Sequence, residues 1–304
     1  MIKYFSITDG KIIQTENTSA SIRHYINPDE NEKRLLVETY KIDEHTLNSS
    51  LDADELSRFE IEPQHTAVIF KTPKNYTAHY PLLFKVDSAG LFLFKDKLIL
   101  VTNEELQFFN GKPFLKVNSL NDAALKVIFR SIYHFMEHLK VINMLSDEIE
   151  AKISKSMENK YLLNQFKLGK SLVYFQNGIN SNTVLLEKMK LNAQKLNLNV
   201  EETELLDDII IENNQCYRQA EIYSNILASL MDAKASLISN NLNMLMKTLN
   251  IITIAIMVPT FVVSAFSMNV KIPLQDRPDA FLIVMGLALI SVIAFLMFWK
   301  WKKW

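Results

Sequence analysis

The sequence predicts an α+β domain, followed by long helices and a C-terminal pair of membrane-spanning helices. Three observations indicate this fold class. β-rich runs occur in residues 1–115, proline is absent between Pro113 and Pro259, and two long stretches near the C-terminus carry no charge. The chain has 304 residues, of which 48% are hydrophobic, and one cysteine, Cys216. This composition excludes a disordered or disulfide-linked protein.

Residues 1–118 are predicted to form a cytoplasmic α+β head. Runs of β-branched and aromatic residues, separated by turn residues, predict strands at 2–7, 11–15, 34–40, 66–71, 81–86, 91–94 and 97–102. The acid-rich segment 41–60 predicts short helices between the strands.

Residues 119–200 are predicted to form a hairpin of two cytoplasmic helices. Asn121 and Asp122 can cap a helix that runs to about Phe166, and a second helical stretch covers roughly 170–198. The first helix has an apolar face made of Ile128, Ile132, Phe135, Leu139 and Ile142.

A third helix begins near Thr203 and carries an apolar seam. No stop signal separates this seam from the first uncharged stretch, so one helix is predicted over 203–266, with a stalk at 201–247. A seam of this length favours packing against copies of the same helix. The seam consists of Leu206, Ile209 with Ile210, Cys216 with Tyr217, Ala220, Tyr223, Leu227, Leu230 and Leu237.

The uncharged stretches 248–270 and 280–299 are long enough to cross a membrane as helices. A helix rises about 1.5 Å per residue, and the hydrocarbon core is about 30 Å thick. The connector 271–279 is short and contains two prolines, so the spans form a tight hairpin around an external loop. A pair of buried core helices is the alternative, which adjacent uncharged stretches of this length disfavour.

The basic residues around this hairpin predict its orientation. Lys234 and Lys247 precede the first span and the tail 300–304 is basic, whereas Lys271 and Arg277 in the connector stand near aspartates. The positive-inside rule therefore places both termini in the cytoplasm, and we expect an inner (plasma) membrane protein. No cleaved signal peptide is expected at the N-terminus. Anchoring at the membrane surface is predicted for Trp299, Trp301 and Trp304.

A polar stripe runs along one face of the first span. Its residues recur at steps of three and four, so they share a helix face. A polar side chain facing lipid is costly, so copies of this helix ringing a water-filled pore would explain the stripe. Polar contacts that hold neighbouring helices together are the alternative. The polar stripe consists of Asn243, Met246, Asn250, Thr253, Met257, Thr260, Ser264 and Ser267.

Residues 240–269 (NNLNMLMKTLNIITIAIMVPTFVVSAFSMN), the second span and the tail WKWKKW resemble the CorA family of divalent-cation transporters. Segments 41–60 and 82–104 look like the cytoplasmic head of that family. The resemblance implies a pentameric, funnel-shaped assembly whose pore is lined by the first span. It places Asn243, Leu249, Met257, Thr260 and Ser264 at pore-lining positions.

The sequence departs from the family pattern in three places. The Gly-Met-Asn signature at the outer mouth reads Ser267, Met268 and Asn269 here, and Lys271 follows shortly after. Serine restricts the backbone freedom that glycine would give. Asn48 and Ser49 stand where many relatives have the acids of a regulatory Mg²⁺ site between subunits. Asp208 matches the remaining acid of that site.

The other motifs do not indicate a catalytic site. The segment from His134 to His138 (HFMEH) fits an inverted zinc-protease pattern, but the helix reads as amphipathic and a protease is disfavoured. Cys216 lies on the apolar seam and is expected to be a packed hydrophobe. Acidic residues outnumber basic ones in 1–247, which argues against nucleic acid as a partner. We expect neither an enzyme nor a resident cofactor.

The sequence therefore predicts a channel-like, homo-oligomeric transporter of divalent cations. Mg²⁺ is the default ion, with Co²⁺, Ni²⁺ and Zn²⁺ as further candidates, and a divalent cation is both the transported species and a candidate regulatory ligand at Asp208. Two alternatives stay open. One is a homologue with altered ion selectivity or without divalent transport, suggested by Ser267, and the other is a membrane-anchored oligomeric scaffold without a pore.

Overall fold

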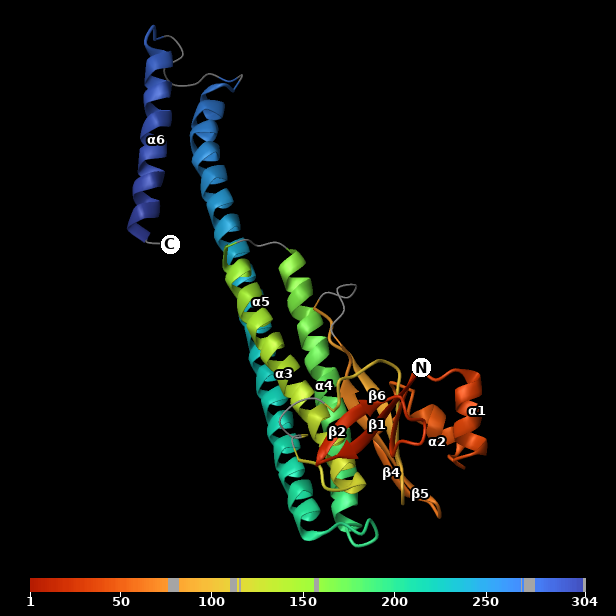
Figure 1. Ribbon diagram of the computed structural model, residues 1–304. Helices are drawn as coiled ribbons and strands as arrows, with labels where there is room; N and C mark the ends of the chain where they lie inside the picture. Colours follow the sequence, from red (N-terminus) through yellow and green to blue (C-terminus); the bar gives the residue numbers. More distant parts are fainter. Residues whose placement is uncertain are drawn as a thin grey trace. The chain divides into compact units, whose positions relative to one another are not determined.

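The computed structural model describes residues 1–75, 82–109, 114, 116–155, 159–268, 270 and 277–302. The chain forms two compact units, Met1–Ser229 and Leu230–Trp304. The first unit contains the sheet and most of the helices, and the second contains the long apolar helices (Figure 1).

A single seven-stranded sheet lies at the centre of the first unit, with strand order β2-β1-β3-β7-β6-β5-β4. Strands β3 and β7 are parallel, and every other neighbouring pair is antiparallel. The strands are β1 Ile2–Thr8, β2 Lys11–Thr15, β3 Ile22–Ile26, β4 Arg58–Ile61, β5 His65–Pro73, β6 Val86–Phe94 and β7 Leu98–Thr102.

The hairpin between β1 and β2 has a two-residue turn. Asp9 and Gly10 both have positive φ, 49° and 72°, and Thr8 pairs with Lys11 across the turn. Two consecutive left-handed residues match the twist of the flanking strands, which is why an Asp-Gly pair suits this position.

Helices cover both faces of the sheet. The short helices α1 (Glu30–Glu38) and α2 (Glu44–Ser49) cover one face, and α3 (Leu120–Lys155) and α4 (Asn159–Leu191) cover the other. Side chains alternate along a strand, so β6 and β7 supply both cores. Leu91, Leu98 and Leu100 join the core beneath α3 and α4, whereas Phe92, Ile99 and Val101 join the core beneath α1 and α2.

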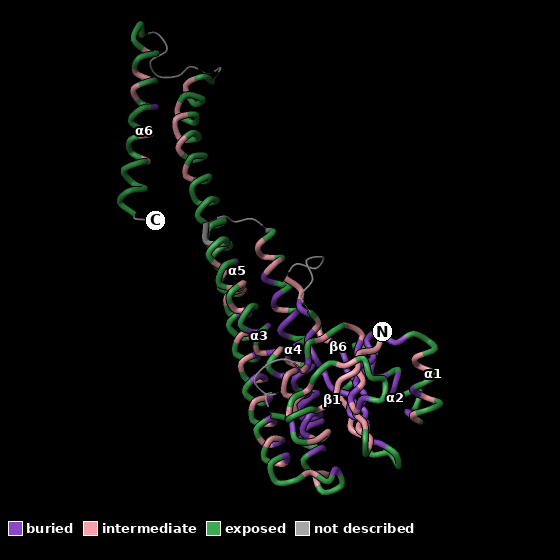
Figure 2. Tube along the Cα trace, in the orientation of Figure 1, coloured by how far each residue is buried: buried purple, intermediate pink, exposed green. Residues whose placement is uncertain are grey.

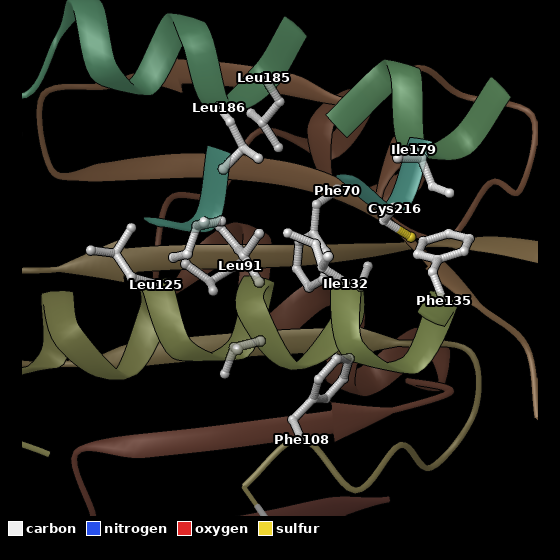
Figure 3. Close-up of a cluster of buried hydrophobic side chains, with 14 of the residues drawn as sticks. Phe70, Leu91, Phe108, Leu125, Ile132, Phe135, Ile179, Leu185, Leu186 and Cys216 are labelled. Carbon is white, nitrogen blue, oxygen red and sulfur yellow. The ribbon is translucent and has the colours of Figure 1, made fainter. Parts of the chain in front are cut away.

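The larger core forms where α3 and α4 meet the sheet (Figure 3). Phe135 of α3 contacts Phe175 of α4 with ring centroids 5.1 Å apart. All five residues of the predicted apolar face of α3 are at most 1% exposed, which confirms that face.

Helix α5 runs from Val200 to Phe266 without interruption, as the sequence predicts. Its apolar seam, however, is partly buried inside the same chain. Five seam residues join the core formed with α3 and α4, so the prediction that the whole seam packs against copies of itself is wrong. The apolar faces of α3 and α4 need covering, and this side of α5 covers them. The buried seam residues are Leu206, Ile209, Cys216, Ala220 and Leu227.

The second unit contains the remainder of α5 and helix α6 (Ala280–Lys302). Both helices are long and apolar enough to cross a membrane. In the most apolar 18-residue stretch of each helix, 0% of the residues of α5 and 6% of those of α6 are buried within the chain. Residues coloured as exposed dominate both helices in Figure 2. This exposure contradicts the alternative in which they are buried core helices.

The structure corrects several predictions for the head. Residues 34–40 are not a strand, because Asp29 caps helix α1 with a complete capping box that includes Glu32. The predicted strand 81–86 is replaced by β6, which begins only at Val86, and residue 81 lies outside the described residues. Strands β3 and β4 were not predicted.

The helix boundaries also differ from the predicted ones. Helix α3 ends at Lys155 instead of near Phe166, and α4 begins at Asn159 and ends at Leu191. Residues 156–158 between these helices lie outside the described residues. A continuous helical pattern spans this connection, so the sequence carries no strong signal for the break.

Replacing Gly90 with alanine should destabilise the head. A Cβ atom there would overlap the Cβ of Ser50 and lie 2.9 Å from its Oγ, at a serine with no exposed surface. We expect Gly90→Ala to lower the free energy of unfolding by about 1–3 kcal/mol through overpacking. Thermal unfolding of the full chain, followed by circular dichroism, measures this change.

Gly169→Ala is the matched control. The nearest atom to its added Cβ, Leu227 Cδ2, lies 3.4 Å away, which is ordinary van der Waals contact. Because Gly169 lies within helix α4, alanine should leave the stability unchanged or raise it by up to about 1 kcal/mol. Equal stability of Gly90→Ala and the wild type would contradict the close approach of α2 to β6.

Candidate functional site

Every residue of the polar stripe is exposed, seven of them on α5 and Ser267 directly after its end, and Leu249 is exposed as well. No described residue on the stripe is charged. The stripe therefore presents amides, hydroxyls and two thioethers to its surroundings, on a helix that is otherwise apolar.

The middle of the polar stripe lies opposite the half-buried side of α5, whereas its two ends border grooves shared with α6. These bordering residues are Asn243, Met246 and Asn250 at one end, and Thr260, Ser264 and Ser267 at the other. In this part of α5 the half-buried residues recur at helical spacing and form one face: Ile251, Ala255, Val258, Pro259, Val262 and Phe266. Several of them line grooves together with Phe295, Met285 and Ala288 of α6. Asn250 and Pro259, like Thr253 and Val262, are nine residues or about two and a half turns apart, which puts them on opposite sides of the helix.

The stripe hydroxyls donate their hydrogens to the helix backbone. Thr253 Oγ1 donates to Leu249 O at 2.8 Å, and Thr260 Oγ1 donates to Ile256 O at 2.6 Å. A hydroxyl has one hydrogen and two acceptor lone pairs. With the hydrogen used, each threonine oxygen offers only acceptor capacity to the outside of the helix. Such oxygens suit the water hydrogens of a hydrated cation.

The Asn243 end of the stripe borders α6 across a groove. This groove of about 530 Å³ between the two helices is bordered by Asn243 and Asn250 of α5 and by Trp299 and Lys302 of α6. A heptad pattern drifts by about 20° per heptad on a straight helix. The stripe therefore rotates toward the flank of α5 at this end.

The predicted outer mouth follows the end of α5. Ser267 and Met268 are exposed, whereas Asn269 and loop residues 271–276 lie outside the described residues. Ser267 donates its hydroxyl to Ser264 O at 3.0 Å, and it does not have the positive φ that would favour glycine. Serine therefore fits this position in the chain without backbone strain.

The predicted regulatory residues lie in the first unit. Asp208 and Asn48 are exposed, and Ser49 is buried. Ser49 Oγ accepts a hydrogen bond from Arg58 Nη2 at 3.0 Å. Arg58, whose Nε is also 3.4 Å from Glu60 Oε1, thus occupies the hydrogen-bonding position beside Ser49. This contact could not be anticipated because β4 was not predicted. Among the described residues, no group of three or more His, Cys, Asp or Glu is arranged to hold a metal.

The two histidines of the HFMEH segment face each other on α3. Their Nε2 atoms are 2.8 Å apart, and His138 is 8% exposed. Burial lowers the pKa of both rings, that of His134 to about 4, with a further contribution from the neighbouring His138. Both imidazoles are therefore neutral near pH 7. The third ligand that a zinc protease requires does not accompany them among the described residues.

A family model described as CorA-like Mg²⁺ transporter protein matches residues 19–303. The cobalt/magnesium transport protein CorA of Methanocaldococcus jannaschii is 22% identical over an alignment of 321 positions. The alignment covers 97% of this chain and 97% of that protein. The match includes both the head and the two apolar helices.

Solved structures share the fold. The complete structure of the CorA magnesium transporter from Methanocaldococcus jannaschii matches with a TM-score of 0.84 at 20% identity, covering 98% of this chain and 96% of that chain. Full-length CmaX matches with a TM-score of 0.74 at 14% identity, covering 100% and 98%. The ZntB cytoplasmic domain from Vibrio parahaemolyticus matches with a TM-score of 0.61 at 13% identity, covering 79% and 98%. The predicted fold class is confirmed.

Cysteine labelling should show that the polar stripe is accessible to water. We expect Thr253→Cys and Thr260→Cys, in lipid vesicles, to react severalfold faster with a charged methanethiosulfonate than Ile254→Cys and Phe261→Cys, because only the thiolate in water reacts. Native Cys216 adds little background, since burial raises its pKa to about 12. Faster labelling at 254 and 261 would contradict the assignment of the stripe.

Proposed function

Since the chain belongs to the CorA-like Mg²⁺ transporter family, whose members are transporters and not enzymes, we propose that it moves divalent metal cations through a pore lined by the polar stripe. Mg²⁺ is the default ion, and Co²⁺, Ni²⁺ and Zn²⁺ are further candidates. The name of the relative from Methanocaldococcus jannaschii, a cobalt/magnesium transport protein, supports this choice. The observation that carries the proposal is an uncharged, exposed and acceptor-rich helix face.

The chemistry of the stripe suits an ion that keeps its water. Mg²⁺ dehydrates reluctantly, so a ring of neutral oxygens can accept hydrogen bonds from its hydration shell without binding the ion tightly. We assign entry to Asn269 with Ser267 and Met268, and passage to Ser264, Thr260 and Met257. A narrow neck lies near Leu249 and Asn243, where apolar rings can close the pore by dewetting.

A single stripe requires several copies of the chain. One α5 helix cannot enclose a path, so we propose a homo-oligomer, a pentamer by likeness to the family, with α6 helices outside and facing lipid. The lysines beside both spans support cytoplasmic termini in an inner membrane. The proposed division is a head at 1–118, a helical hairpin at 119–200, a stalk at 201–247, spans at 248–270 and 280–299 joined by loop 271–279, and a tail at 300–304.

Ser267 favours one alternative, a homologue of the same architecture with altered ion selectivity or no divalent transport. Its side chain adds a hydroxyl at the mouth where glycine would add none, although that hydroxyl donates to the end of α5. A scaffold without a pore is the other alternative, and the exposed amide of Asn250 within the first span counts against it because it would need a buried partner in lipid.

Thr260→Val should reduce ion uptake by at least about tenfold in proteoliposomes loaded with an Mg²⁺ indicator, because each copy loses an acceptor that contributes about 1 kcal/mol. Thr248→Val is the matched control. Its hydroxyl also donates to the helix backbone, at 2.9 Å to Met244 O, but Thr248 lies off the stripe. Failure of the wild type to pass Mg²⁺, Co²⁺, Ni²⁺ and Zn²⁺ as an intact oligomer would contradict divalent transport.

Asp208→Ala should change Mg²⁺ protection against proteolysis very little. Ser49 supplies no carboxylate and is bonded to Arg58, so the site proposed by likeness to the family is incomplete. Limited proteolysis with and without Mg²⁺ measures this, with Asp232→Ala, another exposed position on α5, as control. A large loss of protection confined to Asp208→Ala would show that other ligands complete a regulatory site.

A further inference from the structure

The histidine pair on α3 lies at a polar pocket of the first unit. His134 lines a pocket of about 220 Å³, together with Glu105, Gln107, Arg130 and Glu137. His138 lies one helical turn further on and directs its Nε2 toward the Nε2 of His134, 2.8 Å away. Two ring nitrogens thus converge on one point beside a space that can hold water.

The ring of His138 is held in place by aromatic neighbours. Its centroid lies 5.3 Å from that of Phe84 and 6.1 Å from that of Phe175, both with edge-on geometry. This packing fixes the direction of the buried nitrogen. Only His134, which is half-buried, needs to adjust when a ligand enters between the two rings.

The spacing of the nitrogens favours particular metals. Two nitrogens at about 2.05 Å from one ion are about 2.9 Å apart when they are at right angles, and about 3.3 Å apart in a tetrahedron. The observed 2.8 Å is nearer to the first value. Right-angled nitrogen ligands occur in octahedral and square-planar sites, which suit Ni²⁺ and Cu²⁺ better than tetrahedral Zn²⁺.

The charges around the pair do not exclude a cation. Arg130 is the nearest positive group of the pocket, and its Nη1 is 3.1 Å from Glu137 Oε1, which offsets its charge. Glu105 adds a carboxylate to the same pocket and is paired with Lys3. The pocket is therefore close to neutral before a metal binds.

We propose that His134 and His138 form a binding site for one first-row transition-metal ion of the Ni²⁺ or Cu²⁺ type, with pocket water completing the coordination. When the metal binds, the ring that carries its hydrogen on Nε2 changes to the tautomer with the hydrogen on Nδ1, so that both Nε2 lone pairs face the metal. Imidazole nitrogen is a poor ligand for Mg²⁺, so the site would retain transition metals while Mg²⁺ is in large excess. This inference goes beyond the proposed transport and does not depend on it.

Nickel titration calorimetry on the full-length protein in detergent, without a polyhistidine tag and in excess Mg²⁺, tests the proposal. The wild type should bind one Ni²⁺ per chain. His134→Gln should weaken binding by at least about tenfold, because one of two protein ligands is lost. The control His45→Gln changes an exposed histidine of α2 and should bind as the wild type does.

Two measurements guard against a misfolded variant. The thermal unfolding midpoint should rise with Ni²⁺ in the wild type and not in His134→Gln. Electron paramagnetic resonance of Cu²⁺ bound to the wild type should show two nitrogen ligands. Equal Ni²⁺ affinity of the wild type and His134→Gln, loss of binding in His45→Gln, or a Cu²⁺ spectrum without two nitrogens would each overturn the proposal.

Discussion

The fold depends on one constraint: a polar side chain in hydrocarbon must be kept from lipid. Helix α5 carries its polar stripe on exposed positions, and only the ends of the stripe border α6. One chain therefore leaves the middle of the stripe without a partner, which the proposed oligomer would supply. The same helix joins the stripe to the core of the head, so in that assembly each copy of the stripe would be attached to a folded domain.

The sequence predicts the helical part of this fold well and the sheet less well. Uncharged length suffices for α6, and uncharged length with the absence of proline before Pro259 suffices for α5, because a membrane span leaves few alternatives. The head is harder, because short strands are decided by tertiary packing. Residues 34–40 have β-rich composition but follow a capping box at Asp29 and Glu32, and the local hydrogen bonds of the cap prevail. The short strand β4 has only the antiparallel partner β5, and its pattern is too brief to detect.

The candidate site, like the fold, was predictable where helix geometry decides and not where side-chain contacts decide. Heptad spacing alone places eight residues on one face, because helix geometry fixes which side chains share it. Spacing does not reveal that the hydroxyls of Thr253 and Thr260 donate hydrogen bonds to backbone carbonyls, since that depends on the side-chain rotamer. Likewise Asn48 and Ser49 can be recognised as a loss of acids, but the approach of Arg58 to Ser49 requires the fold. The two histidines of the HFMEH segment carry only a weak signal in the sequence. They indicate a candidate metal site only because the structure places their Nε2 atoms 2.8 Å apart.

The two sets of ligands in this chain differ in what they can hold. In the proposed pore, the oxygens of the stripe would touch an ion through its water, so that binding is weak and many ions pass. The histidine pair offers nitrogens that bind a metal directly, and His138 is rigidly packed between Phe84 and Phe175. A nitrogen site of this kind placed in the pore would trap a transition metal and block the path. The two proposed sites keep these chemistries apart, with oxygens on α5 and nitrogens on α3, which would let the same chain conduct hard cations and retain borderline ones without conflict.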